Sequence, residues 1–179
     1  MASYKVNAIV FKSKEIGEAD RLLTVFSQHY GKLTLMAKGV RRPISRKAGC
    51  LQPFNLVKLV VAKTRTWHII TEAETIQCYT QIVESLSKAG AAYYLAELAD
   101  QLVPLEQKNE AVFILLKRFF SQLDQGKLYP KDLFNYAFEL TQILGFGPPE
   151  QVTDLKSLEH YLESVIEKEL NSKFLLRQL

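Results

Sequence analysis

The sequence predicts an α+β protein in which a small N-terminal β-barrel of five strands is followed by an all-α helical domain. Residues 1–80 contain short stretches of alternating apolar and polar residues separated by turns, which is typical of strands. From Gln81 the apolar residues recur at helical spacing. The charge also divides near this point: residues 1–80 carry 13 Lys+Arg against 5 Asp+Glu, whereas residues 81–179 carry 10 against 14. We therefore predict two domains, residues 1–80 and residues 81–179.

The strands come first. The five predicted strands are Tyr4–Lys12, Leu22–Ser27, Leu33–Lys38, Leu56–Ala62 and Thr66–Ala73. A polar break over Ser13–Arg21 separates the first two, and the turn His29–Lys32 joins the second and third into a hairpin. Five short strands with one longer connection, between the third and fourth, match the element count of an oligonucleotide-binding (OB) barrel. An SH3-like barrel has nearly the same count, so strand number alone leaves both open.

The second half contains amphipathic helices. The predicted helices are Gln81–Leu102, Val112–Leu123, Pro130–Leu144 and Leu158–Leu170, followed by an apolar tail. The first is apolar over much of its circumference, so we place it centrally, and Pro104 ends it. Pro130 stands at a first-turn position, and Gly145 stands where a C-terminal cap is expected.

The connection between the third and fourth strands is a basic loop. Gly39 stops the strand, and the ten residues from Lys38 contain no acid but five cations, which are Lys38, Arg41, Arg42, Arg46 and Lys47. Such a density of like charge is unfavourable alone, so it indicates a polyanionic partner; a solvated surface loop is the alternative. Three basic residues on neighbouring segments, Lys14, Arg21 and Lys32, are predicted to support the loop in binding nucleic acid.

Other sites are poorly supported. Cys50 and Cys78 form no C-x-x-C motif and the three histidines are scattered, so we expect no disulfide, zinc site or other cofactor. This cysteine usage, with no signal peptide and no membrane-spanning run, indicates a cytoplasmic protein. The candidate catalytic carboxylates are Glu15, Glu18 and Asp20. They lie close to Lys14 and Arg21, and no other metal-ligating residue accompanies them. A nuclease is therefore a weak alternative, and we predict that the protein is not an enzyme. Trp67 and Tyr30 could stack on nucleobases, although aromatic residues of a small barrel more often lie in its core.

Several motifs together resemble the RecO family of bacterial recombination-repair proteins. In the first half these are Gly17-Glu18-x-Asp20, Gly31-Lys32, Ala37-Lys38-Gly39-x-Arg41 and Leu51-Gln52-Pro53-Phe54. In the second half these are Tyr94-Leu95-x-Glu97-Leu98, Phe138-Glu139-Leu140, Leu144-Gly145-Phe146-Gly147-x-Pro149 and Leu170-x-Ser172. The resemblance implies an OB barrel followed by a helical domain. It also implies a cytoplasmic, nucleoid-associated mediator that binds single- and double-stranded DNA, anneals strands, engages RecR and single-stranded-DNA-binding protein, and assists RecA loading.

The sequence departs from this family in two places. Many members carry a four-cysteine zinc module after the Gly-aromatic-x-Pro element, whereas here Pro149 leads within a few residues to the last helix, as in a short form without zinc. Some members also have arginines before the Phe-Glu-Leu element, where Asn135 and Tyr136 stand here. The acidic tail of the single-strand-binding protein would then have to contact Lys117, Arg118 or Lys131. An adaptor whose helical domain binds partner peptides without direct DNA binding is the alternative function.

Overall fold

The computed structural model describes residues 2–45, 47–126 and 130–176. Its internal contacts group the chain into two compact units. The first comprises Met1–Cys78 with Leu105–Phe113, and the second comprises Tyr79–Pro104 with Ile114–Leu179. The assignment of folding domains to residues 1–80 and 81–179 stays a prediction, but the contacts of Leu105–Phe113 are mainly with the first unit.

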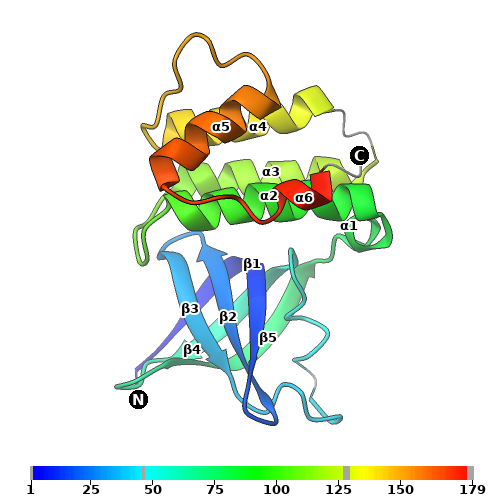
Figure 1. Ribbon diagram of the computed structural model, residues 1–179. Helices are drawn as coiled ribbons and strands as arrows, with labels where there is room; N and C mark the ends of the chain where they lie inside the picture. The colour runs from blue at the N-terminus through cyan, green and yellow to red at the C-terminus, as the bar shows by residue number, and fades with distance from the viewer. Residues whose placement is uncertain (1, 46, 127–129, 177–179) are drawn as a thin grey trace. The chain divides into compact units, whose positions relative to one another are not determined.

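The first unit is a closed five-stranded barrel (Figure 1). The strands are β1 (Ser3–Ile16), β2 (Asp20–Ser27), β3 (Gly31–Ala37), β4 (Leu56–Ala62) and β5 (His68–Gln77). They pair in the order β1-β2-β3-β5-β4, with β1 also paired to β4; only the β3–β5 pair is parallel. The predicted fold class, an OB-type barrel followed by helices, is confirmed, as is the hairpin of the second and third strands.

The barrel interior follows the alternation in the sequence. One face of β1, β2, β3 and β4 supplies most of the core, with Ile70 from β5, and the other face of each strand points outward. The buried core residues include Val6, Val10, Leu23, Val25, Leu35, Leu59 and Val61. In β1 the register shifts between Val10 and Lys12, so Phe11 is a bulge residue that changes which side chains face inward.

The predicted polar break over Ser13–Arg21 is wrong, because most of it is strand. Beyond the bulge, Lys12–Ile16 pairs with Asp20–Thr24 as a two-stranded ribbon. None of the residues from Lys12 to Ile16 is buried. The alternation signal depends on one buried face, so it is lost where a ribbon extends past the core. The fourth strand has the predicted bounds, whereas β5 continues to Gln77, four residues past the predicted end.

The second unit is all helical. Its helices are α1 (Thr80–Glu84), α2 (Leu86–Leu102), α4 (Pro130–Ile143), α5 (Leu155–Ile166), α6 (Lys173–Leu176) and most of α3 (Glu110–Asp124). Helix α2 contacts α1, α4 and α6, and its buried residues include Tyr94, Leu95 and Leu98, so it is central as predicted. In the part of the chain that the structure describes, none of the helices has the length and apolarity needed to cross a membrane.

The helices differ from the prediction by one to three residues at several ends, and by more in three places. The predicted first helix is split at Ser85, whose Oγ accepts a hydrogen bond from Lys88 N and so caps α2. Helix α5 ends at Ile166 rather than Leu170, because Glu167 adopts a left-handed conformation (φ 56°). The predicted apolar tail contains the short helix α6.

The segment Leu105–Phe113 is attached to the barrel beside the start of β3. Glu106 N donates to Lys32 O at 2.9 Å, and Gln28 Nε2 donates to Glu110 Oε1 at 3.2 Å. Gly31 lies at the closest approach, since a Cβ added there would be 1.9 Å from the carbonyl oxygen of Gln107. Its φ of +68° is also one that L residues with side chains rarely adopt. This position therefore requires glycine for two independent reasons.

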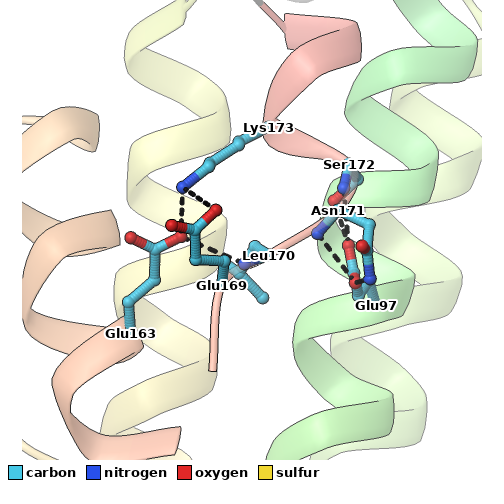
Figure 2. A network of polar contacts seen from close by, with 7 residues as sticks. All are labelled: Glu97, Glu163, Glu169, Leu170, Asn171, Ser172 and Lys173. Atoms are coloured by element: carbon cyan, nitrogen blue, oxygen red, sulfur yellow. Dashed lines mark hydrogen bonds and ion pairs between the residues drawn. The ribbon is translucent and has the colours of Figure 1, made fainter. Parts of the chain in front are cut away.

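The residues before α6 are held on α2 by one carboxylate (Figure 2). Glu97 Oε1 accepts hydrogen bonds from the backbone N and Nδ2 of Asn171, at 3.0 and 2.9 Å. Its Oε2 accepts from the backbone N and Oγ of Ser172, at 2.7 and 2.6 Å. Burial raises the pKa of Glu97, but these hydrogen bonds outweigh it and hold the pKa below its ordinary value. The ionised carboxylate is therefore part of the folded structure.

The same segment before α6 is also held by an ion pair between Lys173 and acidic residues (Figure 2). Lys173 Nζ is 2.8 Å from Glu163 Oε1 of α5 and 3.3 Å from Glu169 Oε2. Glu163 Oε1 also accepts from Leu170 N at 3.0 Å. The segment from Leu170 to Lys173 is thus bonded to both α2 and α5.

We predict that Gly31→Ala lowers the free energy of unfolding by on the order of 2–5 kcal/mol, because it adds backbone strain and a steric clash. Urea unfolding of the full chain, followed by circular dichroism, measures this. Gly49→Ala is the matched control, since Gly49 has ordinary φ and open space around it, and it should change stability by less than about 0.5 kcal/mol. Equal effects of the two substitutions would contradict the account of Gly31.

We predict that Glu97→Gln costs about 1–3 kcal/mol at pH 7, because an amide cannot accept all four hydrogen bonds. The depressed pKa of Glu97 means that its ionised form stabilises the protein above the ordinary carboxyl range, and that this stability is lost as the pH falls through the folded-state pKa. The difference between wild type and variant should therefore shrink below about pH 4. Urea unfolding at pH 7 and pH 3 tests this, with the exposed Glu150→Gln as control. If wild type and Glu97→Gln were equally stable at pH 7, or if their stabilities differed by the same amount at both pH values, the carboxylate would not act as described.

Candidate nucleic-acid interface

The basic loop that follows β3 is bonded to the tip of the β1–β2 hairpin. Gly39 has a φ of +63°, which allows the chain to turn sharply after the strand. Asp20 Oδ1 accepts from Gly39 N at 2.7 Å, and Ala19 O accepts from Arg41 N at 2.9 Å. Hairpin and loop therefore form one surface at one end of the barrel (Figure 1).

The inner side of the same loop closes this end of the barrel. Val40 and Leu51 are buried in the barrel core, at 1% and 0% exposure. Lys47 O accepts from Leu51 N, and Lys47 Nζ donates to Ile70 O, each at 3.2 Å. Because the loop is anchored from inside, its outward side chains project from a fixed backbone.

Two of the predicted cations are paired with a carboxylate. Arg41 lies 3.0 Å from Glu15 and also donates to Gly17 O at 3.3 Å. Arg21 lies 3.9 Å from the same carboxylate, while its buried Nε has no hydrogen-bond partner within the described parts of the chain. The side chains of Arg41 and Arg21 are 31% and 25% exposed, so both charges still reach solvent. Glu15 thus orients the two arginines and reduces their positive potential.

Three further cations of this end are open to solvent, whereas Lys47 is half-buried and its amine is bonded to Ile70 O, so it is not part of the exposed set. Lys14, Lys38 and Arg42 are exposed, and no ion pair joins any of them to a carboxylate of residues 2–45, 47–126 or 130–176. Arg46, which the sequence also predicts, lies outside the described residues. The exposed set, together with Arg41, gives the surface that we call the basic end: Lys14, Lys38, Arg41 and Arg42.

Lys32 is not brought together with the basic end. It lies near the start of β3, whereas Lys38 directly follows the end of that strand. Six residues at about 3.3 Å each place them roughly 20 Å apart. Lys32 therefore belongs to the other end of the barrel, where its carbonyl accepts from Glu106 N.

The three predicted partner-binding residues differ in their surroundings. Arg118 of α3 is ion-paired with Glu139 of α4 and lies over the ring of Tyr136, 5.2 Å from its centroid. Lys117 and Lys131 are exposed. An acidic peptide would meet Lys117 and Lys131 directly, but would have to compete with Glu139 for Arg118.

Two acidic residues of the hairpin have structural roles. Asp20 caps the turn at Gly39, and Glu15 pairs with Arg41. Over the described ranges, no three His, Cys, Asp or Glu side chains cluster as metal ligands would. Glu15 and Asp20, two of the three carboxylates considered as a nuclease site, thus serve the attachment of the loop, and the third, Glu18, is exposed.

Sequence reasoning missed the pairing with Glu15 and misjudged two aromatic residues. Glu15 precedes Arg41 by 26 residues, and the two meet because the loop is hydrogen-bonded to the tip of the β1–β2 hairpin. Arg21 is paired with Glu15 across the ribbon, so this contact could have been predicted once the ribbon was recognised. Trp67 and Tyr30 are each 41% exposed, so the expectation that they lie in the core is wrong.

The family models and the similar proteins all indicate the same family. The family model described as "Recombination protein O N terminal" matches residues 1–79, and "Recombination protein O C terminal" matches residues 83–153. Similar proteins include "DNA repair protein RecO" of Pelotomaculum thermopropionicum, 35% identical over 83% of this chain and 57% of the relative. Those of a Thermoanaerobacter species and a Roseiflexus species are 32% and 34% identical, over 83% and 81% of this chain. The chain spans about half to three fifths of the length of these relatives, at 57%, 60% and 51%.

We predict that Glu15→Gln strengthens binding to a short single-stranded oligonucleotide by about two- to fivefold. The substitution removes the carboxylate that pairs with Arg41, and a surface ion pair of this kind is worth about 0.4–1 kcal/mol. Fluorescence anisotropy at low salt measures the affinity. Glu150→Gln changes the net charge equally, but lies in the helical unit, and should have little effect. Equal affinities for Glu15→Gln and wild type would show that Arg41 does not face the nucleic acid.

Proposed function

This chain belongs to the RecO family of DNA repair proteins, and from that premise we propose that it is a non-enzymatic mediator that binds single- and double-stranded DNA and anneals complementary strands. The observation that carries the proposal is the basic end, where Lys38 and Arg42 project from a loop anchored to the barrel core and to the β1–β2 hairpin. A repair role follows from the family. Annealing and the individual partners are the finer part of the proposal.

The chemistry of the basic end suits phosphates rather than bases. Lys38 and Arg42 are exposed cations without a carboxylate neighbour in the described structure, so they can replace the counterions of a DNA backbone. Arg42 can also donate two parallel hydrogen bonds to one phosphate. Contacts of this kind carry no sequence information, so the binding is expected to be nearly independent of sequence and steeply dependent on salt.

Annealing follows from the same electrostatics. Two single strands repel each other through their phosphates, and a shared cationic surface lowers this repulsion while bringing the strands close. Pairing is then made by the bases themselves. The protein supplies proximity and charge, and no covalent bond is made or broken.

The helical unit is proposed to meet other proteins of the pathway. An acidic tail of single-stranded-DNA-binding protein would be attracted to Lys117 and Lys131, which are exposed on α3 and α4. RecR as a partner and assistance in RecA loading are implied by the family resemblance. These interactions are proposed for the whole protein, because this chain spans only part of the length of its relatives.

We predict that the double variant Lys38→Ala, Arg42→Ala weakens binding to single strands. The plot of log K against log salt should become less steep by about 1.4, since each lost phosphate contact removes about 0.7 for a single strand. Anisotropy titrations of a labelled oligonucleotide between roughly 50 and 200 mM salt, a range over which phosphate binding changes strongly, measure both. The variant should fold with unchanged stability, because both residues are exposed. It should also anneal complementary oligonucleotides more slowly than wild type.

The matched control for this experiment is Lys156→Ala, Lys168→Ala, which removes the same charge from exposed positions of the helical unit. The control should retain the wild-type slope. Identical slopes for both double variants would refute the assignment of the basic end. If bare oligonucleotides fail to bind wild type in the absence of other proteins, the adaptor function is correct instead.

A further inference from the structure

The end of the barrel away from the basic end contains a cleft. Its volume is about 250 Å³, and its lining comes from the turn between β4 and β5, from β3 and from the segment after Pro104. The lining residues that matter here are Thr34, Arg65, Trp67, His68 and Glu106. All of them belong to the first unit, so the cleft is a property of the barrel with its attached segment.

Aromatic rings are concentrated around this cleft. Trp67 and Tyr30 are each 41% exposed, although large aromatic side chains are favourable to bury. The ring centroids of Tyr4 and Tyr30 are 4.8 Å apart, and the Tyr4 hydroxyl is hydrogen-bonded to His68 Nδ1 at 3.1 Å. His68 and Trp67 both line the cleft, and ring contacts run from His68 through Tyr4 to Tyr30.

The backbone that carries Trp67 is held in place. Thr64 Oγ1 accepts from Trp67 N at 3.2 Å, and the same hydroxyl donates to Trp67 O. A hydroxyl that bonds to both backbone groups of a residue three positions later fixes a tight turn. Trp67 is therefore presented from a closed turn, and ordering it on a ligand costs less conformational entropy.

Cations alternate with the aromatic rings. Lys63 Nζ lies 5.6 Å from the centroid of the Tyr4 ring, and Arg65 is exposed on the same turn as Trp67. Glu106 also lines the cleft, and its charge disfavours a phosphate inside. A base can enter such a cleft while its phosphates stay near the lysine and arginine. This combination of stacking rings and backbone-binding cations is typical of surfaces that bind single strands.

We propose that this cleft is a stacking site for an unpaired nucleobase, with Trp67 as the platform and Lys63 and Arg65 on the adjoining phosphates. The proposal rests on the proposed function and extends it. The basic end binds the phosphates of single strands and of duplexes alike, so it does not distinguish them. A base inside a duplex has both faces covered by its neighbours, so only an unpaired base can stack on Trp67. The cleft would thus give the barrel a preference for single strands that charge alone cannot give.

Trp67 is the single tryptophan of the chain, so its fluorescence reports directly on this site. The full chain is titrated with three probes: a single-stranded oligonucleotide, an abasic oligonucleotide of the same length, and a blunt-ended duplex of two complementary strands, which has no unpaired bases. Stacking should quench the fluorescence with the first probe only. Trp67→Ala should weaken single-strand binding roughly 5- to 150-fold and leave duplex binding and the salt slope unchanged. Trp67→Phe should retain most of the affinity, and Tyr93→Ala, an exposed aromatic residue of the helical unit, should behave as wild type.

The results separate this inference from the proposed function. Single-strand binding by anisotropy without a change in tryptophan fluorescence, or with equal affinity for Trp67→Ala, overturns the stacking site and leaves the basic end intact. Equal loss of single-strand and duplex affinity in Trp67→Ala also overturns it. Absence of any DNA binding by wild type overturns both proposals.

Discussion

The closure of the barrel by β1 is the constraint on which both proposed binding surfaces depend. This strand pairs with β4 through its first residues and with β2 through its later ones, so the sheet has no open edge. The bulge at Phe11 lets its second part leave the core as a ribbon with β2, and the tip of that ribbon anchors the basic loop through Asp20. Its first part places Tyr4 among the aromatic residues at the other end. One long strand therefore sets the position of both sites.

The basic end is a compromise between attachment and charge. A loop with several cations would repel itself, and the hairpin supplies Asp20 and Glu15 as internal counter-charges. These acids hold the backbone at Gly39 and the guanidinium of Arg41, but they also reduce the attraction for a polyanion. Lys38 and Arg42 carry the charge that remains outward. The structure thus distinguishes cations that support the loop from cations that can bind a ligand, which the sequence alone does not.

Much of the fold could be predicted because strands and helices with one buried face leave a periodic signal, as in β4 and α2. The signal was absent in the ribbon Lys12–Ile16, where neither face is buried, and in Leu105–Phe113, whose partner lies at the start of β3, far back in the chain. For the sites, the residue types could be predicted but their neighbours could not. The separation of Lys32 from Lys38 was implied by the strand predicted between them, but the exposure of Trp67 follows from turn geometry that local composition does not encode.

The most direct test of the central claim is amide chemical-shift mapping of the isotope-labelled chain with a short oligonucleotide, first at low salt and then at high salt. The account predicts that the largest changes occur at the β1–β2 hairpin tip and at Lys38–Arg42, and that they diminish as salt is raised. Changes confined to the helical unit, or changes at the barrel that persist unaltered in high salt, would contradict the claim that an anchored cationic loop binds the DNA backbone by charge.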